Sequence, residues 1–394
     1  MRVLIAPDSF TGTLSAPAAA AAVADGWRRQ APGDELELLP LSDGGPGFVD
    51  VLHAALGGDL LPVTVPGPLG DPTPAVILLT PGDADAGART AYVESAHACG
   101  SHLVPADRRD PGRATTAGVG RLLGEARAAG ATRIVVGLGG SGTNDAGAGA
   151  LLAAAEAVGV ELPPRLRDLL GRGGAGLHGA AAADRAPRTG VRAAWSDTEI
   201  VVATDVDAPL LGPHGASLGF GPQKGATPDQ AKELESALMG FAGSAIAATG
   251  VPQRTVATPG AGAAGGLGFG LMLLGGLRSA GIDAVADAVG LRDRIAATDL
   301  VITGEGRLDW QSLQGKVVAG VAALGLATGV PVIALAGQVE IGRRELLNLG
   351  IESAYPLART PDQLRRALAD PAGTLTERAA RVARTWTRPA GNRA

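Results

Sequence analysis

The feature that most constrains the fold is a repeat of short apolar runs, each ending in a Gly-rich turn and followed by an Ala/Leu/Arg-rich stretch with helical spacing. Strand–turn–helix units of this kind form right-handed crossovers between parallel strands. The sequence therefore predicts an α/β fold built on a parallel sheet. The expected strands are residues 3–5, 35–38, 75–79, 91–94, 134–136, 200–202, 300–302 and 332–335. The expected helices are one that begins with Ser15 as N-cap and those over 115–129, 146–158, 228–248 and 314–328.

Composition excludes several classes of protein. The chain has 394 residues, and at roughly 150 residues per domain this length favours two or three domains or one large α/β unit. Its single cysteine, Cys99, excludes an intrachain disulfide and a Cys-rich zinc site. A net charge of −5 gives no basic field for nucleic acid. The N-terminal apolar run is too short for a signal peptide or a membrane span, so we expect a cytoplasmic protein without membrane partners.

Acidic residues lie in or beside the turns that follow four of the predicted strands, at residues 6–12, 137–149, 203–207 and 303–309. In parallel sheets, ligands bind outside the carboxyl ends of the strands. The four turns are therefore the expected site of function.

The turn over residues 137–145 joins a predicted strand to a predicted helix. Its backbone N–H groups can converge on an anion, helped by the helix dipole. It is neither a Walker A loop nor a dinucleotide-binding fingerprint. The alternative is a tight turn in which Asn144 or Asp145 caps the helix. The candidate anion-binding residues are Gly139, Gly140, Ser141, Thr143 and Asn144, and Asp145 is a candidate Mg²⁺ ligand.

A second turn combines Glu305 and Arg307 with the downstream Lys316. A carboxylate, a guanidinium and an ammonium in so short a span suit a phosphate or carboxylate ligand, although a surface ion-pair network is the alternative. The chain has only three lysines, and two of them, Lys224 and Lys316, lie next to Gly. This placement favours a requirement for a compact positive charge at these positions.

Further carboxylates follow predicted strands at Asp43, Asp205 and Asp207. Because residues two apart in an extended chain share a side, Asp205 and Asp207 suit a divalent metal. Aspartates in turns are also frequent local caps, so each of these residues has that alternative.

Taken together, these motifs resemble the bacterial type-I glycerate kinases, in the same order over nearly the whole chain. The motifs that carry the resemblance are Ala6-Pro7-Asp8-Ser9-Phe10, Asp43-Gly44-Gly45, Gly139-Gly140-Ser141 with Thr143-Asn144-Asp145, Phe220 to Ala226, Pro259 to Gly266, Gly304-Glu305-Gly306-Arg307 with Asp309, Gln311-Ser312, Gly315-Lys316 and Ala336-Gly337.

The resemblance implies a Rossmann-like parallel-sheet domain, a second α/β domain and an active site in the cleft between them. It implies transfer of the γ-phosphoryl group of ATP to glycerate with Mg²⁺. We expect the 2-hydroxyl group of glycerate to be phosphorylated, as in some members of the family. We expect residues 1–44, 108–197 and 285–394 in the first domain and residues 45–107 and 198–284 in the second, in a monomer or homodimer.

On this hypothesis the phosphates of ATP lie against the 139–145 turn and either Lys224 or Lys316, and Glu305 belongs to the same nucleotide site. The metal is held by Asp205 and Asp207 or by Asp145. A carboxylate, Asp43 rather than Asp8, accepts the hydroxyl proton of the acceptor, and Arg307 holds the acceptor carboxylate.

Some positions depart from the family pattern. Thr11 stands where the family has Lys, and Ala208 stands where it has Asn. Pro46 and Arg121 each stand where the family has Glu. Two alternatives to an ordinary glycerate kinase follow. One is a family member with altered chemistry or a different small hydroxy acid as substrate, because His97, Trp310 and Phe48 indicate a reshaped acceptor pocket. The other is a catalytically inactive ligand-binding protein.

Overall fold

The structure, a computed structural model, describes all residues except 11, 82–88, 181–186, 314–315 and 388–394. The chain divides into two compact units. Unit 1 comprises Met1–Asp43, Asp50–Leu56 and Ile282–Ala394, and unit 2 comprises Gly44–Val49 and Gly57–Gly281. No helix among the described residues is both long and apolar enough to cross a membrane.

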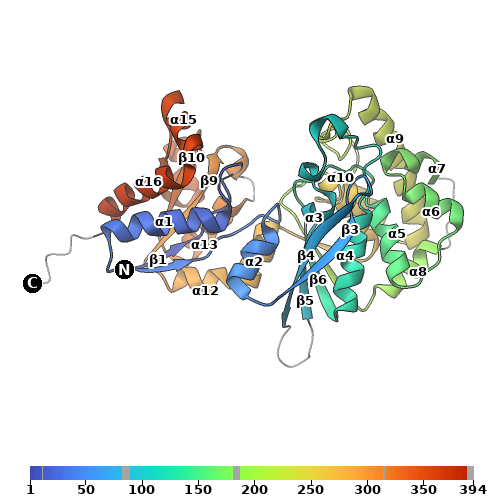
Figure 1. Ribbon diagram of the computed structural model, residues 1–394, viewed down its shortest axis with the longest axis horizontal. Helices are drawn as coiled ribbons and strands as arrows, with labels where there is room; N and C mark the ends of the chain where they lie inside the picture. The colour runs from blue at the N-terminus through green and yellow to red at the C-terminus, as the bar shows by residue number, and fades with distance from the viewer. Residues whose placement is uncertain (11, 82–88, 181–186, 314–315, 388–394) are drawn as a thin grey trace, which may run out of the picture. The chain divides into compact units, whose positions relative to one another are not determined.

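Unit 1 contains a five-stranded sheet of order β11-β10-β9-β1-β2, in which every neighbouring pair is parallel (Figure 1). The chain order reverses between β1 and β9, because β2 lies on one side of β1 and the later strands lie on the other. Such a reversal is where ligands bind in open α/β sheets. The strands are β1 (Arg2–Ile5), β2 (Glu35–Leu38), β9 (Leu300–Leu308), β10 (Val332–Val339) and β11 (Ile351–Pro356).

The helices of unit 1 confirm the expected α/β alternation. Ser15 caps the first of them as expected, because its side chain accepts a hydrogen bond from the Ala18 N–H. The helices are α1 (Ala16–Gln30), α11 (Gly281–Ala288), α12 (Leu291–Ala296), α13 (Val317–Thr328), α14 (Arg343–Leu349), α15 (Pro361–Ala369) and α16 (Pro371–Trp386), and α2 (Phe48–Leu56) begins in unit 2 and continues in unit 1. The expected start of α13 at residue 314 lies outside the described residues.

The last helix, α16, packs along α1 (Figure 1). The two backbones approach so closely that a Cβ added to Gly26 would lie 2.1 Å from the Thr376 carbonyl oxygen. Trp27 of α1 is fully buried in the same core. Small residues at the contact therefore allow the close approach of the two helices.

Unit 2 contains a six-stranded sheet of order β3-β4-β5-β6-β7-β8. The pairs from β5 to β8 are parallel, but β3–β4 and β4–β5 are antiparallel, so the sheet is mixed. The strands are β3 (Asp59–Pro66), β4 (Pro72–Pro81), β5 (Arg89–Glu94), β6 (Ala131–Gly137), β7 (Glu199–Ala203) and β8 (Leu277–Ser279). The α-helices are α3 (Ala96–Cys99), α4 (Ala117–Ala128), α5 (Ala148–Ala157), α6 (Pro164–Leu170), α7 (Leu177–Ala180), α8 (Pro187–Ala194), α9 (Pro228–Thr249) and α10 (Ala263–Leu273).

The division into units differs from the predicted domains in two respects. Residues 50–56 were expected in the second domain but belong to unit 1. Residues 108–197 were expected in the first domain, but they belong to unit 2. The reason is the pairing of β6, which lies between β5 and β7 with parallel register on both sides. The apolar run that forms β6 marks a buried strand without indicating which sheet it joins. The predicted breaks near residues 44 and 285 lie close to the observed ones.

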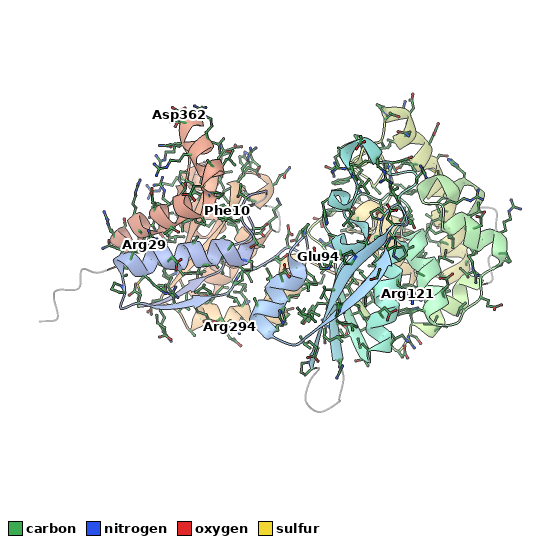
Figure 2. The ribbon with its side chains drawn as sticks, viewed as in Figure 1. Phe10, Arg29, Glu94, Arg121, Arg294 and Asp362 are labelled. Atoms are coloured by element: carbon green, nitrogen blue, oxygen red, sulfur yellow. The ribbon has the colours of Figure 1, made fainter. Side chains whose placement is uncertain are left out.

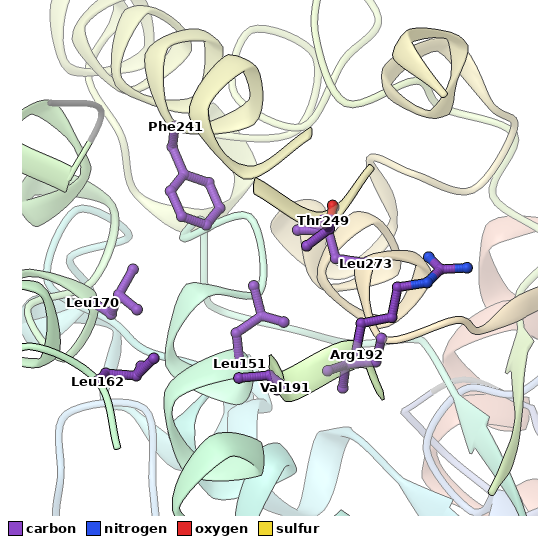
Figure 3. A pocket seen from close by; sticks show the side chains of 9 residues that line it. Leu151, Leu162, Leu170, Val191, Arg192, Phe241, Thr249 and Leu273 are labelled. Carbon is purple, nitrogen blue, oxygen red and sulfur yellow. The ribbon is translucent and has the colours of Figure 1, made fainter. Parts of the chain in front are cut away.

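The helices of unit 2 leave a small apolar cavity inside it (Figure 3). The space open to the centre of a water molecule is about 20 Å³. Leucine side chains dominate its lining, with Phe241, Arg192 and Thr249 among the others. A site of this size and character holds no more than a water molecule, so we treat it as imperfect packing of the core.

Two helical glycines of unit 2 provide a matched test of its packing. A Cβ at Gly268 in α10 would lie 2.0 Å from the Gly260 carbonyl oxygen, whereas a Cβ at Gly243 in α9 would meet nothing. We expect Gly268→Ala to lower the free energy of unfolding by at least ~1–3 kcal/mol because of the clash. Gly243→Ala should raise it by up to ~1 kcal/mol, the gain in helix propensity. Chemical denaturation of both variants measures this, and equal effects would contradict the packing described.

Candidate active site

Strand pairing in unit 1 brings together Asp8, which follows β1, and Glu305, which lies within β9. The turn expected over residues 303–309 is therefore strand as far as Leu308. Ile5 pairs with Ile302, so Asp8 and Glu305, each three residues further on, come level with one another. The Asp8 N–H donates to the Gly304 carbonyl oxygen at 2.8 Å, which holds the turn after β1 against β9. These two predicted site residues therefore meet at the reversal point of the sheet.

Asp43 joins them through the segment after β2. The N–H groups of Leu39 and Leu41 donate to the carbonyl oxygens of Ile5 and Pro7 at 2.8 and 2.9 Å, so this segment continues alongside β1. The charge of Asp43 acts on both Asp8 and Glu305. Three carboxylates thus lie within interacting distance, and we call Asp8, Asp43 and Glu305 the acidic cluster.

Burial and repulsion change the acidity of Asp8. Burial raises its pKa, the negative charge of Asp43 raises it further, and Glu305 adds a smaller increase. The Ser9 N–H, which donates to Asp8 Oδ1 at 2.6 Å, opposes these effects. The resulting pKa is about 7. A carboxyl group with this pKa can take up and release a proton near neutral pH.

Glu305 is buried, and burial raises its pKa above the ordinary value. The Ser312 hydroxyl and the positive charge of Lys316 oppose the rise. Within the described residues, Glu305 Oε1 is buried and has no hydrogen-bond partner. An acceptor oxygen left in this condition indicates a missing donor or cation.

Lys316 immediately precedes α13, and its positive charge acts on Glu305. Arg307 lies differently. Its side chain is 58% exposed and forms an ion pair with Glu340 at 3.6 Å. Trp310 is also exposed, at 64%. The structure therefore associates Lys316 with the acidic cluster, whereas Arg307 is engaged by a carboxylate outside it.

In unit 2 the turn after β6 packs tightly against residues 44–46. A Cβ at Gly139 would lie 2.5 Å from Gly45 Cα, and one at Gly140 would lie 2.9 Å from Pro46 Cγ. Only glycine fits at either position, and Gly140 also has a φ of +65°. Among the described residues, the N–H groups of Gly139, Gly140 and Ser141 donate to no protein acceptor. These amides remain available for the anion predicted there.

Asp145 lies at the end of this turn and is fully buried. Its Oδ2 accepts hydrogen bonds from the N–H groups of Thr116 and Gly149, and its Oδ1 accepts one from the Gly147 N–H. Both oxygens also accept from the Thr116 hydroxyl. Burial raises its pKa and these bonds lower it. Both oxygens are thus used to hold the start of α5, which favours the helix-start alternative over the predicted role as an Mg²⁺ ligand.

Thr143 and Asn144 belong to the same turn, and Lys224 contacts it from the segment 217–224. Lys224 is buried, and its Nζ donates to the Thr143 carbonyl oxygen at 2.8 Å. Burial lowers its pKa to about 8. Asn144 Nδ2 donates to Ser217 Oγ at 3.2 Å. These residues tie the turn to the segment 217–224, so their polar groups face the protein interior and support the turn from below.

Asp205 and Asp207 have separate partners. Asp205 Oδ1 accepts from the Gly281 N–H at 2.8 Å, and Asp207 forms an ion pair with Arg278. Among the described residues, no three His, Cys, Asp or Glu side chains are arranged to hold a metal ion. The binding of one metal ion by these two aspartates stays a prediction.

Sequence reasoning missed Glu94, which lies at the end of β5 (Figure 2). Its side chain is buried, and Oε2 accepts from the N–H groups of Gly47 and Val49 at 3.1 and 3.4 Å. His97 Nε2 lies 3.7 Å from the same oxygen. Glu94 therefore holds the segment that follows Asp43. Its signal in the sequence is a lone acid directly after the apolar run 91–93.

Comparison with known proteins identifies the family. The sequence model of the glycerate kinase family matches residues 3–387. The chain belongs to the glycerate kinase family. It is therefore a phosphotransferase of the kinase type, as the motifs predicted.

Named relatives agree with this assignment. The chain is 42% identical to a glycerate kinase of Bacillus subtilis, over 91% of this chain and 90% of that protein. It is 41% identical to a glycerate 2-kinase of Escherichia coli, over 86% of each. A crystal structure from Salmonella typhimurium LT2, of a protein provisionally assigned as glycerate kinase 2, covers 98% of each chain with a TM-score of 0.77 and 37% identity.

The structure accounts for some departures from the family pattern. Arg121 lies on the exposed side of α4 and pairs with Glu125 at 3.2 Å. At Ala208 it is the backbone carbonyl that is engaged, because it accepts from the Gly262 N–H at 2.9 Å. Pro46 packs on Gly140 within the 44–46 contact. Thr11 lies outside the described residues.

The pKa of Asp8 predicts a pH-dependent stability. Its value of about 7 exceeds the ordinary 3.8, so between these pH values the folded protein holds a proton that the unfolded chain has lost. The contribution of Asp8 to the free energy of unfolding must therefore fall as pH rises through this window. We expect Asp8→Asn to become more stable relative to wild type at pH 8 than at pH 5. Asp25→Asn, on the exposed surface of α1, should show the same difference at both pH values. A constant difference for Asp8→Asn, measured by urea denaturation, would contradict this account.

The hydrogen bonds of Asp145 predict a structural role. Asp145→Asn replaces one acceptor oxygen by an NH₂ group that faces N–H donors, so the free energy of unfolding should fall by at least ~2 kcal/mol. Asp168→Asn, at an exposed position of α6, is the control and should change it by less than ~0.5 kcal/mol. An Asp145→Asn variant of wild-type stability that needs more Mg²⁺ for activity would instead support the metal-ligand prediction.

Proposed function

We propose that the protein phosphorylates glycerate with ATP to give 2-phosphoglycerate. The observation that carries this proposal is the acidic cluster at the reversal point of the unit 1 sheet, in a member of the glycerate kinase family. Phosphoryl transfer requires a proton acceptor for the attacking hydroxyl and positive charge for the phosphates. The cluster and its neighbour Lys316 provide residues for both.

Asp8 is the proton acceptor in this proposal. The sequence favoured Asp43, but the pKa of Asp8, about 7, suits a general base near neutral pH better than that of an ordinary aspartate. Its Oδ1 is engaged by the Ser9 N–H, which fixes the orientation of the carboxylate. Asp43 contributes the negative charge that keeps the pKa of Asp8 high.

The residues of the cluster fit a Mg²⁺ ion that arrives with ATP. Such an ion takes most of its oxygens from phosphates and water and needs only one or two carboxylates. Glu305 is the candidate, because its Oε1 is buried and has no hydrogen-bond partner within the described residues, which is consistent with a cation there. The bound ion would supply charge neutralisation for the phosphate oxygens. Lys316 adds a second positive charge beside Glu305.

Unit 2 contributes an anion site of its own in this proposal. The unused N–H groups of Gly139, Gly140 and Ser141 point to anion binding, and the anions that a kinase must hold are phosphates. Lys224 supports the turn through the Thr143 carbonyl oxygen rather than by direct contact with an exposed anion.

A second candidate function is phosphorylation of a different small hydroxy acid. The observation that favours it is the pair formed by His97 and Glu94 behind residues 47–49, where the family pattern is altered at Pro46 and Phe48. His97 Nδ1 is buried without a hydrogen-bond partner among the described residues, and a hydroxy acid with a further polar group would offer it one.

The test is turnover of D-glycerate with ATP and Mg²⁺, with the product identified by ³¹P NMR. We expect 2-phosphoglycerate, and Asp8→Asn should lower kcat by about 10²–10⁴-fold because the general base is lost. The control Asp25→Asn should keep wild-type kcat.

Other outcomes distinguish the alternatives. Turnover of another hydroxy acid, with little of glycerate, would support the second candidate function. Nucleotide binding without turnover of any acceptor would support the inactive ligand-binding alternative and contradict both proposals.

A further inference from the structure

Unit 1 has an open pocket of about 540 Å³ at the ends of β10 and β11. This volume is within the range of sites that hold a small molecule or a nucleoside. The lining consists of the end of β10, the end of β11 and the start of α15: Gln338, Val339, Glu340, Ala354, Pro356, Ala358, Arg359, Thr360, Pro361 and Leu364. None of the functions assigned above uses this pocket.

Strand register relates the pocket to the acidic cluster. Glu305 of β9 pairs with Ala336 of β10, and Ala336 pairs with Pro356 of β11, which lines the pocket. The three residues form one row across the sheet, so Glu305 and Pro356 are two strand spacings apart, or roughly 10 Å. Both lie toward the carboxyl ends of parallel strands. The triphosphate chain of a nucleotide spans a distance of this order.

The lining offers both kinds of contact that a nucleoside requires. Val339, Pro361 and Leu364 present apolar surface suited to the faces of a base. Gln338 and the half-exposed carboxylate of Glu340 offer hydrogen bonds for base edges or ribose hydroxyls. The Thr360 side chain is used elsewhere, because it accepts from the Gln363 N–H at the start of α15.

The pocket also carries a positive charge. Within the described residues, Arg359 has no carboxylate partner at ion-pair distance, whereas Glu340 in the same lining is paired with Arg307. Burial lowers the pKa of the neighbouring Arg378, and the positive charges of Arg381 and Arg359 lower it further. Excess positive charge beside an open pocket favours a ligand with negative charge. A neutral sugar or a free base would make no ion pair with the Arg359 guanidinium.

We propose that this pocket binds the nucleoside end of the phosphoryl donor, a nucleoside triphosphate whose phosphate chain extends toward the acidic cluster. The inference rests on the proposed function for the identity of the donor. It adds the part of unit 1 that recognises the donor.

The experiment compares binding of ATP with binding of inorganic triphosphate, which has the phosphates but no nucleoside. Leu364→Trp fills the pocket from α15, and its control is Leu368→Trp, on an exposed position of the same helix. Isothermal titration calorimetry should show ATP affinity at least 10-fold lower in Leu364→Trp, with triphosphate affinity unchanged. Leu368→Trp should bind both like wild type.

A second variant keeps the test valid if the first one misfolds. Arg359→Ala removes the positive charge and should raise KM for ATP at least threefold, with KM for glycerate unchanged. Its control, Arg292→Ala, makes an equal change of charge at an exposed position of α12 and should leave both KM values unchanged. Wild-type KM for ATP in both pocket variants would overturn the inference while leaving glycerate phosphorylation intact. A rise in KM for glycerate alone would also overturn it, because the pocket would then hold the acceptor. Wild-type protein that binds ATP through this pocket but does not phosphorylate glycerate would support the inference and contradict the proposed function.

Discussion

The parallel pairing of β1 with β9 forces like charges together, and the chemistry of unit 1 depends on this constraint. The pairing brings Asp8 level with Glu305, and the segment after β2 brings Asp43 beside them. Burial and mutual repulsion both oppose ionisation of carboxylates. The sheet tolerates this arrangement because its backbone hydrogen bonds and buried core fix the strands. A cation or a proton at the cluster relieves the repulsion, so the fold favours binding of one or the other.

In unit 2 the corresponding constraint is the close approach of two backbone segments, the turn after β6 and residues 44–46. Gly139 and Gly140 let the turn after β6 pack directly on residues 44–46, while Glu94 holds residues 47 and 49 from the other side. Asp145 and Lys224 support the same turn from within. Residues 44–49, which follow Asp43 in the sequence, are thus fixed by contacts within unit 2. A change in any of these supports is expected to alter the segment without touching a substrate.

The sequence predicted the parts of the fold that depend on local pattern. The eight expected strands all lie within observed strands, and Asp8 follows β1 as expected. Glu305 was expected in a turn over 303–309, but it lies within β9, which continues to Leu308. Strands β3, β8 and β11 were not predicted; β3 is rich in exposed residues and β8 has only three residues. Helix α16, which continues to Trp386, was not predicted either.

Roles within the site were harder to predict, because they depend on contacts that are distant in sequence. Asp145 looks like a metal ligand until its bonds to Thr116, 29 residues away, are seen. Lys224 looks like a phosphate ligand, but it is buried against Thr143. Which carboxylate has the raised pKa depends on burial and on the approach of β1 to β9. The spacing of residues in the sequence shows neither the burial of a carboxylate nor the approach of β1 to β9. The family resemblance predicted the activity, and the contacts in the structure are the basis on which we propose roles for the individual residues.

The central claim is that Asp8 is the base, and that its pKa is raised by burial and raised further by the charge of Asp43. The measurement that tests it most directly is the pH dependence of kcat/KM for glycerate phosphorylation in wild type and Asp43→Asn. The account predicts an ascending limb with an apparent pKa of about 7 in wild type. In Asp43→Asn the limb should move to lower pH, whatever the residual rate, because the repelling charge is gone. A limb at the same pH in both proteins would contradict the account.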